Sequence, residues 1–248
     1  MTKSTKVFLG LLGLYAFLAA INLYLPMGSL SALVPQAQQL PAPKIVIALA
    51  SAGIVLVIYG LLGYLGLFLS RKLGWPDLLD SRVSNRRRFL TPLILGVSLG
   101  VILIVGDLIF SQFNGFGRFI HPPFPTSLVA SAAAGIGEEI IFRLFFISFW
   151  VWLFSSVILK GRWQNKIFWV VAILSALAFA IGHYPGLLLI LGFKSAAAIP
   201  LALHIEIISF NGLIGLVCAY YFRKAGFLAA VGIHFWTDIV WHVLWGLF

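Results

Sequence analysis

The chain alternates between long apolar stretches and short segments that hold most of its charged residues. About 20 consecutive apolar residues suffice for an α-helix to cross a bilayer. The stretches that reach or approach this length are Val7–Leu25, Ile45–Ser70, Phe89–Phe113, Ser127–Leu159, Ile167–His183, Ala197–Phe222 and Ala225–Phe248. The pattern therefore predicts an all-α fold, a polytopic membrane helical bundle with seven transmembrane helices.

Two parts of this pattern allow a different helix path. The fourth stretch is much longer than a bilayer requires, so it must tilt strongly, kink or extend beyond the membrane, and Gly135 and Gly137 are candidate kink points. Between the fifth and sixth stretches, Pro185 begins a segment that is compatible with a re-entrant turn. If Gly186–Ile208 and Phe210–Phe222 are instead two separate spans, the bundle has eight transmembrane helices.

Composition excludes the soluble alternatives. Hydrophobic residues make up 61% of the 248 residues and charged residues 10%, whereas a soluble domain carries about 25% charged residues. A soluble enzyme, a disordered chain and a nucleic-acid-binding protein are therefore excluded, despite the net charge of +10. The first stretch has 19 residues, which is longer than the roughly 7–15 of a signal-peptide core and favours a retained span.

The basic residues predict the orientation of the bundle. They concentrate at the N-terminus and in alternate loops, namely at Lys3, Lys6, Arg71, Lys72, Arg82, Arg86, Arg87, Arg88, Lys160, Arg162, Lys166, Arg223 and Lys224. The other loops hold only Lys44, Arg118 and Lys194. Since cytoplasmic loops carry an excess of basic residues, we expect an integral multi-pass membrane protein, surrounded by membrane lipid, with a cytoplasmic N-terminus.

The acidic residues show the opposite distribution. Most of them lie inside the apolar stretches, as does one arginine: Asp107, Glu138, Glu139, Arg143, Glu206 and Asp238. Each charged side chain at mid-bilayer costs on the order of 2.5–3.5 kcal/mol, and such side chains usually face a bundle interior or a watery cavity. The sequence therefore predicts a buried polar cavity in which several of these groups meet.

The densest cluster is Gly137-Glu-Glu-Ile-Ile-Phe-Arg143. On a helix, Glu139 and Arg143 are four residues apart in the favourable acid-first order, so they are expected to pair. Glu138 projects about 100° away and stays free to act as a general base. The alternative interpretation is a buried ion pair that only fixes helix packing.

Two further pairs have the same helical spacing. Phe179 and His183 share one helix face, and so do His234 and Asp238. Each histidine alone is equally consistent with a core or interfacial residue, and the His–Asp pair with helix stabilisation. Three such elements on three apolar stretches favour a shared polar site within the membrane.

The three motifs, in this order and spacing, resemble the CAAX-protease and bacteriocin-processing (CPBP, or Abi) family of intramembrane proteases. The resemblance extends from about Ser127 to Trp245. It divides the chain into N-terminal transmembrane helices, residues 1–126, and a CPBP/Abi-like catalytic core, residues 127–248, packed together as one domain.

The resemblance also implies a role for each motif residue. Glu138 would activate water with assistance from His183, and His234 with Asp238 would stabilise the oxyanion. Glu139 and Arg143 would hold the site in shape, with Phe179 as a supporting residue. Many family members have Asn where this chain has Asp238, and an ionised carboxylate cannot donate to an oxyanion. Asp238 is therefore expected to be protonated, to orient His234 or to bind a metal.

The sequence leaves the catalytic type open. In a metal-free mechanism, Glu138 and His183 deprotonate water and His234 donates to the oxyanion. In a zinc mechanism, His183, His234 and one carboxylate of Glu138, Glu139 or Asp238 hold Zn²⁺ with an open position for water.

The function implied is an intramembrane endopeptidase that hydrolyses membrane-associated peptides or proteins, of a prenylated or leader type. The sequence leaves their identity and the oligomeric state open. The alternatives are a catalytically inactive membrane scaffold or immunity protein, and a transporter with a Glu/His proton relay.

Other polar residues of the second half give weaker signals. Asp107 is a candidate counter-charge for Arg143 or for another basic residue, and His242 is a candidate support for Asp238. His121 is expected at the surface, because it lies in a proline-rich loop. His204 and Glu206 point to different helix faces, and each is a candidate for lining the cavity.

Overall fold

The computed structural model describes residues 2–33 and 41–248, and this part of the chain contains helices and no β-strand. Seven of its helical runs are long and apolar enough to cross a membrane, which confirms the predicted all-α polytopic bundle. They are Lys3–Tyr24, Lys44–Lys72, Arg86–Phe110, Thr126–Ile158, Gln164–Leu191, Leu201–Ala225 and Phe227–Leu247. Each run overlaps the apolar stretch that predicts it.

Most runs combine an α-helix with tighter or wider turns. The α-helices are α1 (Lys3–Ile21), α2 (Leu30–Leu33), α3 (Lys44–Ile54), α4 (Gly60–Lys72), α5 (Thr91–Phe110), α6 (Thr126–Glu139), α7 (Ser148–Val151), α8 (Gln164–Ile181), α9 (Tyr184–Leu191), α10 (Leu201–Ala225) and α11 (Phe227–Asp238). Turns of π-helix occupy Val55–Tyr59, Arg86–Leu90, Ile140–Ile147, Trp152–Ile158 and Ile239–Leu244. Short 3₁₀ turns occupy Asn22–Tyr24, Ala196–Ala198 and Trp245–Leu247.

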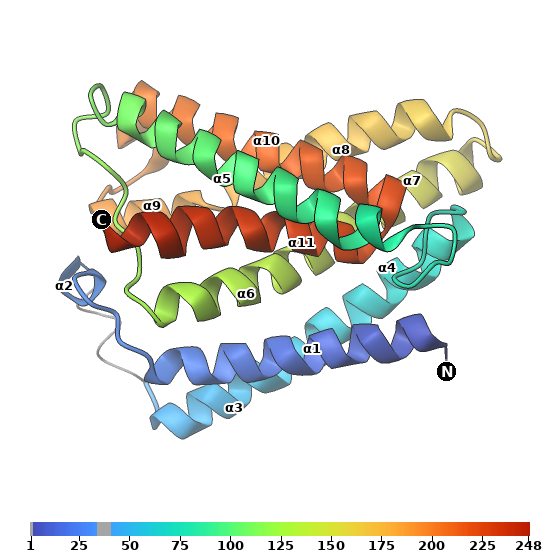
Figure 1. The fold of residues 1–248 in the computed structure, drawn as a ribbon, viewed down its shortest axis with the longest axis horizontal. Coiled ribbons are helices and arrows are strands. Elements are labelled where there is room, and N and C mark those ends of the chain that lie inside the picture. The colour runs from blue at the N-terminus through green and yellow to red at the C-terminus, as the bar shows by residue number, and fades with distance from the viewer. Residues whose placement is uncertain (1, 34–40) are drawn as a thin grey trace.

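Helix α11 occupies the middle of the bundle. It packs against α5, α6 and α10, and α6 in turn packs against α1 (Figure 1). Helix α8 lies along α10. The N-terminus lies at one end of the bundle and the C-terminus at the other (Figure 1). Helices α6, α8 and α11, which carry the three motifs, are therefore brought into one part of the structure.

The fourth run is irregular at a different place from the predicted one. Its α-helix ends at Glu139, and π-helical turns follow at Ile140–Ile147. Gly137 has a packing role instead. A Cβ atom at this position would clash with the ring of Tyr15 on α1. The glycine thus allows α1 to approach the helix that carries the first motif.

The alternative with eight spans is wrong. Helix α10 runs without interruption from Leu201 to Ala225, so the predicted break near Ser209 does not occur. Helix α9 follows α8 after a short break at Gly182 and His183, and the two form one apolar run of 28 residues. The segment after His183 therefore extends the fifth span.

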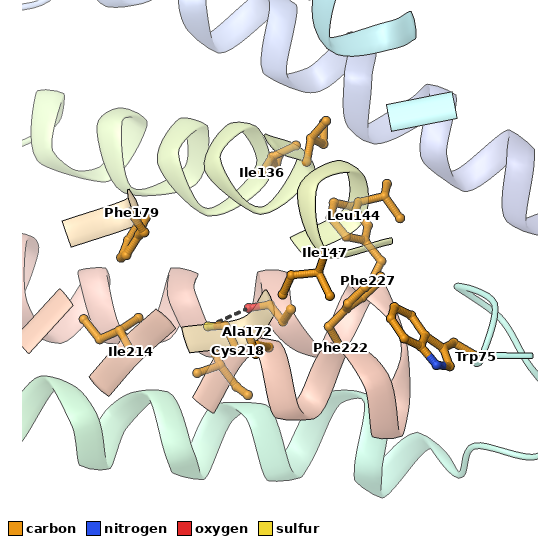
Figure 2. Packing of buried hydrophobic residues seen from close by; sticks show 14 of the residues in the cluster. Trp75, Ile136, Leu144, Ile147, Ala172, Phe179, Ile214, Cys218, Phe222 and Phe227 are labelled. Carbon is orange, nitrogen blue, oxygen red and sulfur yellow. Dashed lines mark hydrogen bonds between the residues drawn. The ribbon is translucent and has the colours of Figure 1, made fainter. Parts of the chain in front are cut away.

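Apolar side chains cover the outside of the bundle and also fill its interior. Large hydrophobic residues such as Leu61 and Leu201 are exposed, as expected for a surface that faces lipid. Figure 2 shows the buried cluster, in which Trp75, Phe222 and Phe227 pack together toward one end. Cys218 is a fully buried member of this cluster.

Candidate active site

Glu139 and Arg143 form the predicted ion pair. Both side chains are fully buried, and Arg143 Nη1 lies 3.1 Å from Glu139 Oε1. On α10, Gly215 leaves room for the guanidinium, because a Cβ atom there would lie only 3.2 Å from Arg143 Nη2. The neighbouring Glu138 has a different environment: its side chain is 38% exposed and it lines a cavity. One carboxylate is thus neutralised while the next is available for chemistry.

His234 connects the first and third motifs. Its Nδ1 lies 2.9 Å from Oε1 of Glu139, which is the oxygen that also pairs with Arg143. Its Nε2 lies 3.6 Å from Asp238 Oδ2 and 3.7 Å from Glu138 Oε2. The hydrogen-bond partner of His234 is therefore Glu139, and the helix neighbour Asp238 lies slightly farther away. Glu139 fixes the imidazole so that Nε2 faces the other two carboxylates.

The phenyl ring of Phe179, in the second motif, lies between residues of the first and third motifs. His183 Nδ1 donates to the carbonyl oxygen of Phe179 at 2.8 Å, which leaves Nε2 free. The Phe179 ring is fully buried and meets the His183 and His234 rings edge to face, at centroid distances of 4.9 and 5.5 Å. The Arg143 guanidinium lies 4.5 Å from the centre of this ring. Phe179 therefore supports both imidazoles and covers the buried ion pair.

The motifs meet at a cavity of about 330 Å³. Glu138, His183, His234 and Asp238 line it, and most of the remaining wall is apolar. The structure thus brings together the four predicted residues that would touch a substrate. Glu139, Arg143 and Phe179 lie behind them as buried supports.

Asp107 does not pair with Arg143, whose counter-charge is Glu139. It accepts hydrogen bonds from the Phe119 backbone N–H at 3.1 Å and from Trp245 Nε1 at 3.3 Å. The basic residue near it is Arg118.

His121 is not a surface residue. Its Nδ1 lies 3.0 Å from Nδ1 of His242, and both rings line the cavity. Burial and the nearby Arg118 lower the pKa of His121 to about 4, so this imidazole is neutral near pH 7. The sequence alone does not reveal this pair, because His121 lies in a loop and His242 lies 121 positions later, in the last helical run.

His204 and Glu206 lie in different environments, as their spacing of two residues along a helix predicts. His204 bonds to the hydroxyl of Tyr184 at 2.6 Å and lies outside the cavity wall. Glu206 is fully buried and lines the cavity.

Within the described residues, no three His, Cys, Asp or Glu side chains converge in a way that could hold a metal ion. Glu139, one of the candidate ligands, already pairs with Arg143 and His234 through Oε1. The site therefore consists of a free glutamate and two oriented imidazoles.

Comparison with known proteins agrees with this geometry. Residues 120–240 match a family model described as Rce1-like, type II CAAX prenyl endopeptidase Rce1-like. No curated protein and no solved structure matches the chain. The matched region contains all three motifs, from Glu138 to Asp238. The match confirms the resemblance seen in the motifs: residues 120–240 of this chain are similar to Rce1-like type II CAAX prenyl endopeptidases.

Proposed function

We propose that the protein is an intramembrane endopeptidase that cleaves membrane-associated peptides with water activated by Glu138 and His183. The family match supports CAAX-type endopeptidase activity in general. The observation that carries the finer proposal is that Glu138, His183, His234 and Asp238, from three separate motifs, line one cavity within the bundle.

Glu138 is the proposed general base. A water molecule between Glu138 and the free Nε2 of His183 loses a proton to the Glu138 carboxylate as its oxygen attacks the scissile carbonyl carbon. The C–O bond forms and the carbonyl oxygen becomes an oxyanion. The protonated Glu138 then gives its proton to the leaving nitrogen as the C–N bond breaks. Neither product requires an additional proton donor.

His234 is the proposed oxyanion donor. Because Glu139 accepts from Nδ1–H, donation to an oxyanion requires a proton on Nε2 as well, so His234 acts as an imidazolium. The carboxylates of Glu138, Glu139 and Asp238 around the ring stabilise this positive charge. Asp238 therefore acts through His234. This role would explain why the chain can have an acid at the position where many family members have Asn.

The proposed substrate is a membrane-associated peptide, prenylated or of a leader type. The mainly apolar cavity wall supports a substrate with an apolar segment. The proposed orientation places the N-terminus in the cytoplasm. The N-terminus and the base-rich α4–α5 and α7–α8 connections lie at the same end of the bundle (Figure 1).

The test is cleavage of quenched fluorescent peptides by the purified protein in detergent and in liposomes. Glu138→Gln should abolish cleavage, because the amide cannot take a proton from water, while elution volume and melting temperature stay close to wild type. His183→Ala and His234→Ala should lower kcat in the same assay. Cleavage by Glu138→Gln at the wild-type rate would exclude the proposed mechanism.

A further inference from the structure

Glu206 is a buried acid that the proposed hydrolysis does not use. Its side chain has no exposed surface, and it lines the same cavity as Glu138. Within the described residues, its side chain has one hydrogen bond, a long contact of 3.5 Å from Asn114 Nδ2 to Oε2. The other oxygen, Oε1, has no hydrogen-bond partner. Glu206 therefore lacks the strong partner that a buried carboxylic acid needs.

Asn114 supplies only a weak partner through this long contact. Its Nδ2 donates to the Gly117 carbonyl at 3.0 Å, which is shorter than its contact with Glu206. Its Oδ1 accepts from the backbone N–H groups of Phe116 and Gly117 at 2.9 and 3.0 Å. The Asn114 amide thus holds the loop after α5 in shape.

The cavity wall does not provide a counter-charge either. Arg118 is the one Lys or Arg among the described lining residues, and its guanidinium lies over the Trp245 ring at 5.1 Å. No described residue forms an ion pair with Glu206. Glu138 and Asp238 line the same cavity as Glu206. Among the described lining residues, carboxyl groups therefore outnumber lysine and arginine side chains.

The position of Glu206 along α10 sets its distance from the hydrolytic centre. Glu206 belongs to the cavity-facing stripe of α10, with Leu203, Phe210 and Ile214. Gly215, which lies against Arg143, follows Glu206 by nine residues. A helix rises by 1.5 Å per residue, so Glu206 and Gly215 lie about 13 Å apart along the axis of α10. An extended peptide covers this length with about four residues.

We infer that Glu206 is a specificity subsite that binds a lysine or arginine side chain of the substrate, about three or four residues from the scissile bond. An ammonium or guanidinium group would supply the donors that Oε1 and Oε2 lack and would neutralise the acid inside an apolar wall. This inference rests on the proposed peptidase function, because it treats the cavity as the place where a peptide binds.

The experiment uses one cleaved peptide whose scissile bond is known from mass spectrometry. Each of the four residues on either side is replaced in turn by lysine, norleucine or glutamate. With wild-type protein in liposomes, we expect lysine at one position to raise kcat/KM by about tenfold or more over norleucine. Glu206→Gln should remove this advantage, so that the variant cleaves the lysine and norleucine peptides with similar kcat/KM.

Ser209→Ala is the matched control, because Ser209 lies on the outer face of the same helix and should keep the lysine preference. Equal cleavage of lysine and norleucine peptides by the wild type at every position would overturn the inference, whether or not the variant folds. A lysine preference that persists in folded Glu206→Gln would also overturn it.

A binding measurement separates this inference from the proposed function. If wild-type protein cleaves none of the peptides, the proposed function fails, and fluorescence anisotropy with the same peptides still tests Glu206. Tighter binding of a lysine peptide that disappears in Glu206→Gln would support the subsite. Equal binding of all peptides would overturn it.

Discussion

Nδ1 of His234 lies 2.9 Å from Oε1 of Glu139, and the same oxygen lies 3.1 Å from Nη1 of Arg143. One buried carboxylate oxygen therefore joins the first motif to the third. It balances the arginine charge and sets the direction of the imidazole at the same time. The stability of the bundle and the geometry of the site depend on the same atom.

Removing the Glu139 charge should affect both properties. Glu139→Gln leaves Arg143 as an unpaired buried charge, so we expect the unfolding free energy to fall by about 3–5 kcal/mol. The peptidase kcat should fall as well, because His234 loses its anionic partner. Denaturant unfolding in detergent and steady-state peptide cleavage measure the two effects.

The double variant Glu139→Gln/Arg143→Met separates these effects. Replacing a buried ion pair by uncharged groups is often close to neutral for stability, so most of the lost stability should return while kcat stays low. A double variant with wild-type kcat would show that Glu139 does not orient His234.

Phe179 should matter for catalysis beyond its contribution to packing. Phe179→Ala is expected to cost about 3–5 kcal/mol, as for other buried phenylalanines, and to lower kcat because both imidazoles lose their support. Phe168→Ala is the matched control: Phe168 is equally buried and has an arginine, Arg223, at the same 4.5 Å from its ring.

Activity per folded molecule distinguishes the two variants. We expect Phe168→Ala to lose stability and keep kcat, and Phe179→Ala to lose both. Equal kcat values for the two variants would mean that Phe179 acts only as core.

Chelators should leave the activity unchanged, because the proposed mechanism uses Glu138, His183 and His234 without a metal ion. Peptide cleavage is measured before and after incubation with o-phenanthroline and EDTA, alongside elemental analysis of the purified protein. Loss of activity that added Zn²⁺ restores would contradict the metal-free mechanism. Glu138→Gln serves as the inactive reference.

Acid should destabilise the protein in part through His121. Its pKa is about 4 in the folded protein against an ordinary 6.5, so unfolding takes up a proton between these values. Stability from this group is complete above pH 6.5 and falls as the pH decreases. Between pH 7 and pH 5 we expect a loss of about 1–2 kcal/mol.

The control for this prediction is His121→Asn, which has no titrating group at this position. Its unfolding free energy should depend less on pH over the same interval. Identical pH dependence in wild type and His121→Asn would show that His121 titrates normally. His242, the partner ring, is retained in both proteins.

Local patterns predicted much of this structure. The apolar stretches located all seven spans, because burial in lipid demands length and hydrophobicity that the sequence displays directly. The Glu139–Arg143 pair was predictable because both residues lie one turn apart on a single helix. The bond between Glu139 and His234 joins residues 95 positions apart, so it depends on how α6 packs against α11, which helical spacing does not encode.

The same reason explains the contacts of Asp107 and His121, which the sequence does not reveal. Both residues interact with the loop after α5 or with the end of the last helical run, and these contacts form only when that loop folds over the bundle. A proline-rich loop predicts exposure on average, and here one of its side chains, the partly buried His121, lines the cavity.

The contact between Gly137 and Tyr15 has a consequence for protein engineering. The region that resembles the protease family begins at residue 120, yet its first helix has a glycine shaped to receive a tyrosine from α1. In a chimera that joins only this region to the N-terminal helices of another protein, the space beside Gly137 would stay unfilled or would receive a side chain that does not fit. We therefore expect residues 120–240 to fold and to be purified successfully only together with the helix that carries Tyr15.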